Sequence, residues 1–329
     1  MRVAYRPMAV RRPDLFDRSV LVVSGKGGVG KTAVAAACAR AAAHRRARVL
    51  LAEIEGREGI ARLLRVPPPG FAERPTRFGH AVLSITAKAA LLEYLTLFFH
   101  MRTLSRSLQR AKVVDVATEA IPGFRDVMVA GKLYELTWWR AGRQRRGDRR
   151  PYDLVVVDAP PTGQLLPFLR SSTAYRELIR AGRPHRQLES IDRLLREDTR
   201  VALVAIPEEM SVAETIETVL ALRDANLPDP LVVVNQVTPP PFPKGVRAAA
   251  LRMEPSDVVR MLKQLEVESD EGAAEDLLRA ALDTDARVRE ERRYIARLEK
   301  AAPVLELPFL FTPSFGPDEV GALAGRFSS

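Results

Sequence analysis

The fold is decided by the stretch Ser19-Val-Leu-Val-Val-Ser-Gly-Lys-Gly-Gly-Val-Gly-Lys-Thr32. Its β-branched and apolar residues, 20–23, predict a buried strand. A glycine-rich turn follows, and the alanine-rich residues 32–45 predict a helix. Residues 25–32 fit the pattern G-x-x-x-x-G-K-[ST], and a strand before it with a helix after it is the context that a phosphate-binding loop requires. The stretch therefore predicts a nucleotide site; the alternative is a structural glycine turn.

The residue types of this loop suit triphosphate binding. Glycine has no Cβ, so the backbone can wrap closely around phosphate oxygens, and the helix N-terminus adds partial positive charge. We expect Lys31 to bridge β- and γ-phosphate oxygens and the Thr32 hydroxyl to hold Mg²⁺. The candidate ATP-binding residues of the loop are Gly25, Gly27, Gly28, Val29, Gly30, Lys31, Thr32 and Ala33.

A second part of the site is predicted at Asp158, which ends the hydrophobic run Leu154-Val-Val-Val157. An acidic residue at the end of a buried strand is typical of the Walker B position, where it binds Mg²⁺ through water. Aspartates at such positions also occur without this role. Together with the loop, Asp158 and Thr32 are the predicted metal-binding residues.

Strands that alternate with helices along the 329 residues predict an α/β fold, a mainly parallel, doubly wound sheet of P-loop NTPase type with helical insertions. The length suits one large domain. We predict an N-terminal arm over 1–18 and a single ATPase domain over 19–329. Its helical segments are expected at about 87–140, 164–197 and 245–300.

Charge and cysteine content narrow the function. The net charge of +10 could indicate nucleic acid or an acidic membrane surface, but the excess is scattered arginine, so nucleic acid is not expected as a partner. The single cysteine, Cys38, permits neither an intrachain disulfide nor a cysteine cluster. No apolar leader precedes the first strand, and the apolar run 87–99 is too short to span a bilayer. A cytoplasmic location is expected.

Lys26, directly after Gly25, makes the loop resemble the deviant Walker A loop of the Min/Par, nitrogenase iron protein and arsenite-ATPase superfamily. In that group the early lysine reaches across a dimer interface to the nucleotide of the partner. The resemblance implies a dimer and a catalytic role for Lys26 beside Lys31 and Asp158.

Over nearly its whole length the sequence is similar to the ArsA/GET-type ATPases of arsenite transport and tail-anchored-protein targeting. The similarity rests on residues 26–32, on Asp158-Ala-Pro-Pro-Thr-Gly163, on Glu214-Thr215 and on Val232-Val-Val-Asn-Gln236. Residues 53–61 resemble the bacterial ArsA-like ATPases that occur as paralogous pairs. The resemblance implies an Mg²⁺-dependent ATPase, a homodimer or a heterodimer with a paralogue, and a hydrophobic client protein or membrane protein. It also allows a peripheral position at the inner face of the membrane.

Three residues carry further implied roles. Most of the family has an aspartate after the second strand that positions the attacking water, and Glu55 aligns there. Glu55 is either catalytic or a solvated switch glutamate of a protein with slow or absent hydrolysis. Asn235 matches an asparagine that recognises adenine, although a turn cap is the alternative. Pro308 falls in a second adenine-side loop.

The sequence predicts less about the client of the ATPase than about its nucleotide site. Arsenite sites use clustered thiolates, and the zinc clasp of eukaryotic GET dimers uses Cys-x-x-Cys, so neither arsenite nor zinc is expected. The apolar stripe Leu91 to Met101 is either core or a groove for a client helix. The arginine loop 140–150 is either solvated or contacts anionic lipid or nucleic acid. The rival functions are a pseudo-ATPase subunit that regulates a paralogue and a Par/Min-type positioning ATPase.

Overall fold

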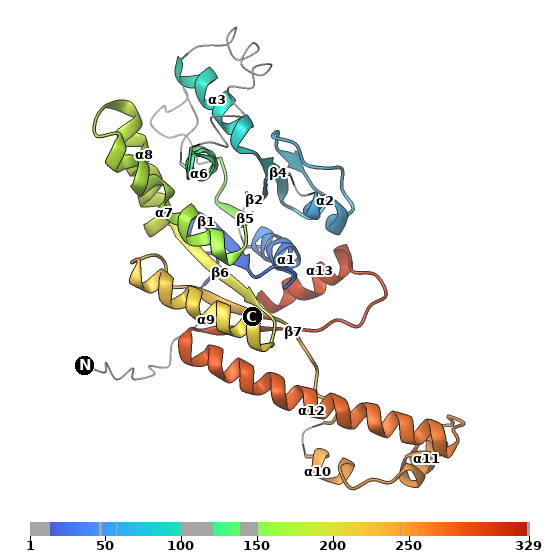
Figure 1. The fold of residues 1–329 in the computed structure, drawn as a ribbon. Coiled ribbons are helices and arrows are strands. Elements are labelled where there is room, and N and C mark those ends of the chain that lie inside the picture. The colour runs from blue at the N-terminus through green and yellow to red at the C-terminus, as the bar shows by residue number, and fades with distance from the viewer. Residues whose placement is uncertain are drawn as a thin grey trace, which may run out of the picture.

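The computed structural model describes residues 14–45, 48–56, 58–99, 121–138, 151–243 and 245–327. Within these residues one eight-stranded sheet has the order β3-β4-β2-β5-β1-β6-β7-β8 (Figure 1). All neighbouring strands are parallel except β3 and β4. This confirms the predicted α/β fold with a mainly parallel sheet. The strands are β1 (Val20–Gly25), β2 (Val49–Ile54), β3 (Arg74–Pro75), β4 (Ala81–Ile85), β5 (Leu154–Asp158), β6 (Thr199–Ala205), β7 (Leu231–Val237) and β8 (Val304–Pro308).

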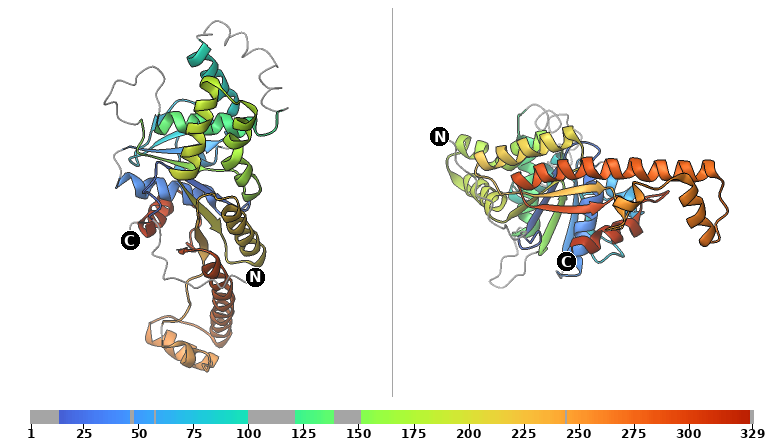
Figure 2. Two further views of the ribbon diagram at one scale, coloured as in Figure 1. Left: turned by 90° about the vertical axis from the view of Figure 1, so that its left-hand side faces the viewer. Right: turned by 90° about the horizontal axis from the view of Figure 1, so that it is seen from below.

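Helices cover both faces of the sheet, because its central strands are apolar on both sides and every residue of β1, β2 and β5 is buried. One face packs against α1 (Lys31–Ala43), α2 (Gly59–Leu64) and α13 (Pro317–Ala324), which a short 3-10 helix follows (Gly325–Phe327). The other face packs against α6 (Phe124–Thr137), α7 (Thr162–Leu178), α8 (Gly182–Glu197), α9 (Glu209–Asp224) and α12 (Glu271–Ala301). The remaining helix on this side, α3 (Ala87–Phe99), packs on α6. Figure 2 shows these layers from two further directions.

The helix that follows the glycine loop, α1, has eight of its thirteen residues buried and none exposed. Its small side chains, mostly alanine, allow its axis to approach the sheet closely. Cys38 lies in the middle of this helix and is fully buried, and burial raises the pKa of its thiol. Because the thiolate is the reactive form, Cys38 has a packing role and no chemistry of its own.

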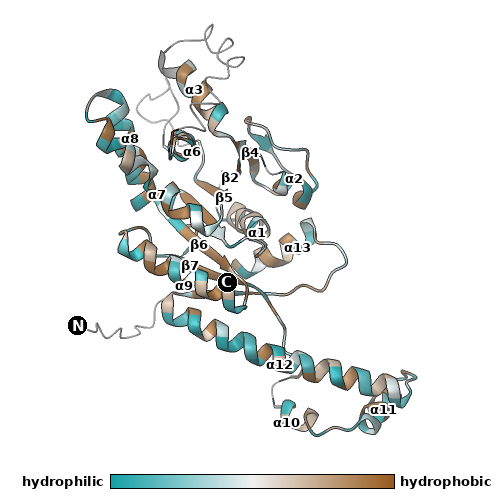
Figure 3. Cartoon of the chain, in the orientation of Figure 1, coloured by the Kyte–Doolittle hydropathy of each residue, from teal (hydrophilic) through white to brown (hydrophobic). Residues whose placement is uncertain are grey.

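A helical projection extends from one end of the sheet (Figures 1 and 2). The sequence predicts mostly helix over 245–300, and the structure divides this region into α10 (Arg247–Ala250), α11 (Pro255–Gln264) and the long α12. The C-terminal part of α12 is fixed to the sheet because both carboxylate oxygens of buried Glu291 accept hydrogen bonds from Thr238, just after β7. The part of α12 that contacts α11 lies away from the sheet, and hydrophilic and hydrophobic residues alternate along it (Figure 3).

Some parts of the chain differ from the sequence prediction. Residues 14–18, assigned to the N-terminal arm, pack against the body through buried Leu15 and Phe16, and Asp17 pairs with Arg200. The short elements α2 and β3 were not predicted. The arginine loop 140–150, Met101 and residues 100–120 of the predicted helical segment 87–140 lie outside the described residues. In the parts of the chain that the structure describes, no helix combines the length and apolarity needed to cross a bilayer.

Candidate functional site

The glycine loop lies at the C-terminal end of β1, the central strand between β5 and β6. Ligands of open α/β sheets bind at this edge, where the strand order reverses. The loop starts at Gly25, where an added Cβ would lie 2.2 Å from the carbonyl oxygen of Val204 on β6. Only glycine therefore lets β1 approach β6 so closely at the point where the chain leaves the sheet.

The rest of the loop forms an open cradle. Gly28 and Gly30 have φ angles of 85° and 89°, which L-residues with a side chain rarely adopt. Among the residues that the structure describes, no other group lies within 4 Å of the positions that Cβ atoms would take on Gly27 and Gly28. Helix α1 then begins at Lys31 without a side-chain cap, so its first N–H groups can bind an anion. This cradle fits the phosphates of a nucleotide.

Lys31 folds back over the loop. Its Nζ donates a hydrogen bond of 2.9 Å to the backbone carbonyl of Lys26. The ammonium is therefore held against the backbone of the loop that would bind the phosphates. The role predicted for Lys31 stays a prediction.

Thr32 and Asp158 come together from two elements, as the sequence predicts for a metal site. The Thr32 hydroxyl, in the first turn of α1, donates a 2.7 Å hydrogen bond to Oδ2 of Asp158 at the end of β5. Asp158 is buried. Hydroxyl and carboxylate oxygens are ligands that Mg²⁺ accepts directly or through water. These two residues would hold Mg²⁺, whose charge would offset the charge of the phosphates.

A further carboxylate, Glu53, was missed by the sequence analysis. It is 1% exposed and pairs in register with Asp158 across β2 and β5. Its two oxygens accept hydrogen bonds from the backbone N–H groups of Glu58 (2.7 Å) and Ile60 (3.1 Å), so it fixes the loop after β2 to the start of α2. An acidic side chain inside a wholly buried strand was the signal that could have revealed it, because buried carboxylates need such partners.

Glu55 lies in that same loop, with a φ angle of 66°. One carboxylate oxygen is 3.0 Å from a guanidinium nitrogen of Arg125 on α6, and the other accepts a 3.3 Å hydrogen bond from the backbone N–H of Ala87 on α3. The Glu55 side chain therefore contacts the helical layer, the group of helices α3, α6, α7 and α8, in this conformation. Its catalytic role stays a prediction.

Lys26 is also bound within its own chain. Its Nζ lies 3.8 Å from Oε2 of Glu214 on α9, and Thr162, at the start of α7, donates a hydrogen bond to the other oxygen of Glu214. The predicted reach of Lys26 to a partner stays a prediction.

Asn235 and Pro308, the residues predicted to contact adenine, lie on β7 and β8. Asn235 on β7 is buried, and its Nδ2 donates a 3.0 Å hydrogen bond to the carbonyl of Val29, which leaves its Oδ1 as the acceptor for a ligand. Pro308 ends β8 and pairs in register with Val237, two residues beyond Asn235. The structure thus places Asn235 and Pro308 on neighbouring strands at the same edge, and places Asn235 against the loop itself.

Comparison with known proteins identifies the family. The family model of the anion-transporting ATPases matches residues 18–196, which include the glycine loop, Glu55 and Asp158. The chain belongs to the anion-transporting ATPase family. The ATPase BagA of Mycobacterium tuberculosis is 38% identical over 246 residues, 73% of this chain and 71% of the relative. A protein of Mycobacterium bovis that is also named as an ATPase matches to the same extent. As a member of the anion-transporting ATPase family, this chain is an ATPase that binds nucleotide.

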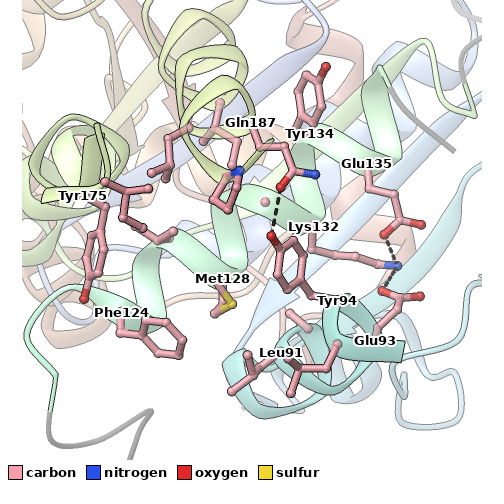
Figure 4. A pocket seen from close by; sticks show the side chains of 18 residues that line it. Leu91, Glu93, Tyr94, Phe124, Met128, Lys132, Tyr134, Glu135, Tyr175 and Gln187 are labelled. Carbon is pink, nitrogen blue, oxygen red and sulfur yellow. Dashed lines mark hydrogen bonds and ion pairs between the residues drawn. The ribbon is translucent and has the colours of Figure 1, made fainter. Parts of the chain in front are cut away.

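A cavity of about 300 Å³ lies among α3, α6, α7 and α8 of this ATPase (Figure 4). Its walls are mostly apolar and include Leu91, Tyr94, Met128 and Tyr175. The predicted apolar stripe, Leu91 to Met101, can therefore be compared with the structure only in its first part. Leu91 is buried on α3 and also lines the cavity, whereas the side chains of 97–101 lie outside the described residues.

Two polar groups border the cavity. Lys132 on α6 is buried, and its Nζ lies 2.6 Å from a carboxylate oxygen of Glu93 and 3.0 Å from one of Glu135 (Figure 4). Burial is the main cause of the raised pKa of Glu135. Nearby, the hydroxyl of Tyr94 donates a hydrogen bond to Gln187. The cavity therefore offers an apolar surface with its charges already paired.

Proposed function

We propose that this member of the anion-transporting ATPase family is an Mg²⁺-dependent, dimeric ATPase that couples its nucleotide state to the helical layer and to an apolar client. The observation that carries the proposal is the conjunction of the open glycine cradle, Lys31 against it, and the bonded pair of Thr32 and Asp158 beside it. Phosphoryl transfer needs positioning and charge stabilisation more than covalent chemistry, and these residues supply both.

Each residue has a defined task in this proposal. The loop N–H groups and Lys31 bind the phosphates and stabilise their charge, while Thr32 and Asp158 hold the metal ion. Glu55 orients the attacking water. To do so, its carboxylate must break the ion pair with Arg125. Because Arg125 belongs to α6, this step links hydrolysis to the helical layer that surrounds the apolar cavity.

The role of Glu55 can be tested in the same loop. Glu55→Gln should retain ATP binding and lose turnover, because the amide keeps the shape and loses the negative charge that accepts a proton. Glu58→Gln is the matched control, since Glu58 is exposed. Turnover like that of the wild type in Glu55→Gln would remove Glu55 from the mechanism.

The dimer can be tested by mixing chains. Lys26→Ala and Lys31→Ala chains should each be inactive, and the mixture should regain partial activity, because the intact Lys26 of one chain would serve the intact phosphate site of the other. If the chains are shown to mix and no activity returns, Lys26 does not act across the interface.

The client proposal rests on the apolar walls of the cavity among α3, α6, α7 and α8. A photo-crosslinking residue at Met128, inside the cavity, should capture an apolar single-span peptide. The same residue at Leu220, which is 52% exposed on α9, should not. Equal capture at both positions would indicate nonspecific adsorption and contradict the proposal.

A catalytically weak subunit that regulates a paralogue is the second candidate, favoured by the ion pair between Glu55 and Arg125. Purified protein without measurable turnover, alone and with its paralogue, would support it.

A further inference from the structure

Glu214 joins two parts of the nucleotide site that are far apart in the sequence. Lys26 belongs to the loop after β1, and Thr162 is the first residue of α7, four residues after Asp158. Both contact the same carboxylate: Lys26 lies 3.8 Å from Oε2, and the hydroxyl of Thr162 donates a hydrogen bond to Oε1. Ser24, near the end of β1, also joins the glycine loop to the segment between Asp158 and Thr162. Its hydroxyl donates a 2.6 Å hydrogen bond to the carbonyl of Pro160.

The two contacts of Glu214 differ in their surroundings. Thr162 is 5% exposed, whereas the side chains of Lys26 and Glu214 are 38% and 36% exposed. A half-exposed ion pair is weak and can exchange its partner for a stronger anion. The partly buried hydrogen bond from Thr162 keeps Glu214 in place, while the lysine remains exchangeable.

If Lys26 reaches the phosphates of a partner, it would exchange its weak, partly exposed contact with Glu214 for a stronger anion. We propose that Glu214 is a positioning residue that holds Lys26 within its own chain, so that the dimer must exchange this ion pair for the partner's phosphates when it closes. This inference rests on the trans role proposed for Lys26. Glu214 also binds Thr162, in the segment that follows Asp158. The same carboxylate therefore connects this segment to Lys26.

The first experiment measures the ion pair in the nucleotide-free chain. Glu214→Gln should raise the rate at which acetic anhydride modifies Lys26, measured by mass spectrometry, roughly two- to fivefold, because the amine is no longer held against a carboxylate. Glu217→Gln is the matched control, because it removes the same charge from an exposed position on the same helix. Equal rates in the two variants would overturn the proposal.

The second experiment measures closure. With a non-hydrolysable ATP analogue and Mg²⁺, Glu214→Gln should lower the dimer dissociation constant roughly two- to fivefold relative to Glu217→Gln, by analytical ultracentrifugation. Equal or weaker dimerisation would overturn the proposal. Matching thermal unfolding curves would show that both variants are folded.

The mixed-chain experiment separates the two proposals. One outcome is that activity returns when Lys26→Ala and Lys31→Ala chains are mixed, while Glu214→Gln leaves the dimer dissociation constant unchanged. In that case Lys26 acts in trans, and only the restraint by Glu214 is wrong. If no activity returns although the chains mix, the trans role itself fails, and the restraint fails with it.

Discussion

The nucleotide edge and the helical cavity are built in opposite ways. At the edge, side chains bind backbone groups of neighbouring loops: Lys31 binds the Lys26 carbonyl, Asn235 the Val29 carbonyl, and Glu53 two N–H groups. Around the cavity, apolar side chains from four helices enclose space, and the charged groups there bind each other. The edge is thus a fixed arrangement of polar groups, whereas the cavity offers mostly apolar walls.

The largest effect is expected at the edge. Lys31→Ala should reduce turnover on the order of 10²- to 10³-fold, because it removes a charge that stabilises the phosphates. Steady-state ATPase assays and nucleotide titrations would measure it. Lys26→Ala should keep ATP binding, so comparable loss of binding in both variants would contradict the separate roles of the two lysines.

A second change tests how rigid the edge is. Gly25→Ala should lower the free energy of unfolding by about 3 kcal/mol, because the new Cβ meets the Val204 carbonyl 2.2 Å away and must separate β1 from β6. Urea denaturation would measure it. Gly27→Ala, whose Cβ meets nothing within 4 Å, is the control and should change stability little.

The corresponding change at the cavity is Lys132→Met, which leaves Glu93 and Glu135 without their shared cation. We expect a loss of about 2–3 kcal/mol at pH 8, measured by urea denaturation. The exposed Lys300, changed to Met, is the control.

The loss in Lys132→Met should shrink as the pH falls toward 5. Burial already raises the pKa of Glu135 above its ordinary 4.5, and removing Lys132, which lowers this pKa, raises it further. A carboxyl with a raised pKa in the folded state binds its proton more tightly there, so protonation favours folding. An equal loss at both pH values would show that Glu135 takes up no proton.

The smallest effect concerns the contact between Asn235 and the loop. Asn235→Ala should cost about 1 kcal/mol, the usual value of one hydrogen bond. An added Cβ on Gly30 would lie 2.5 Å from the Asn235 amide nitrogen, so Gly30→Ala should be less costly in the Asn235→Ala background. Equal costs of Gly30→Ala in both backgrounds, measured by urea denaturation, would show that the two residues do not interact.

The comparison also explains what the sequence could predict. The glycine loop, Thr32 and Asp158 were predictable because the motif dictates backbone geometry and the ends of parallel strands meet at one edge. Glu53 was not identified, since a single acidic residue in an apolar strand has no spacing pattern. Nor could the sequence show that Glu55 contacts Arg125, because this pair joins a loop to a helix 70 positions away. The cavity and the projection depend on how helices cross, which periodicity does not determine.

Cys38 has a consequence for labelling. It is the only thiol of the chain, and its burial in α1 keeps it from thiol-reactive dyes in the folded protein. A cysteine introduced at Leu265, which is 71% exposed after α11, would be labelled selectively while the native thiol stays in place. Fluorescent probes can thus report motion of the projecting helices during ATP turnover without a cysteine-free background.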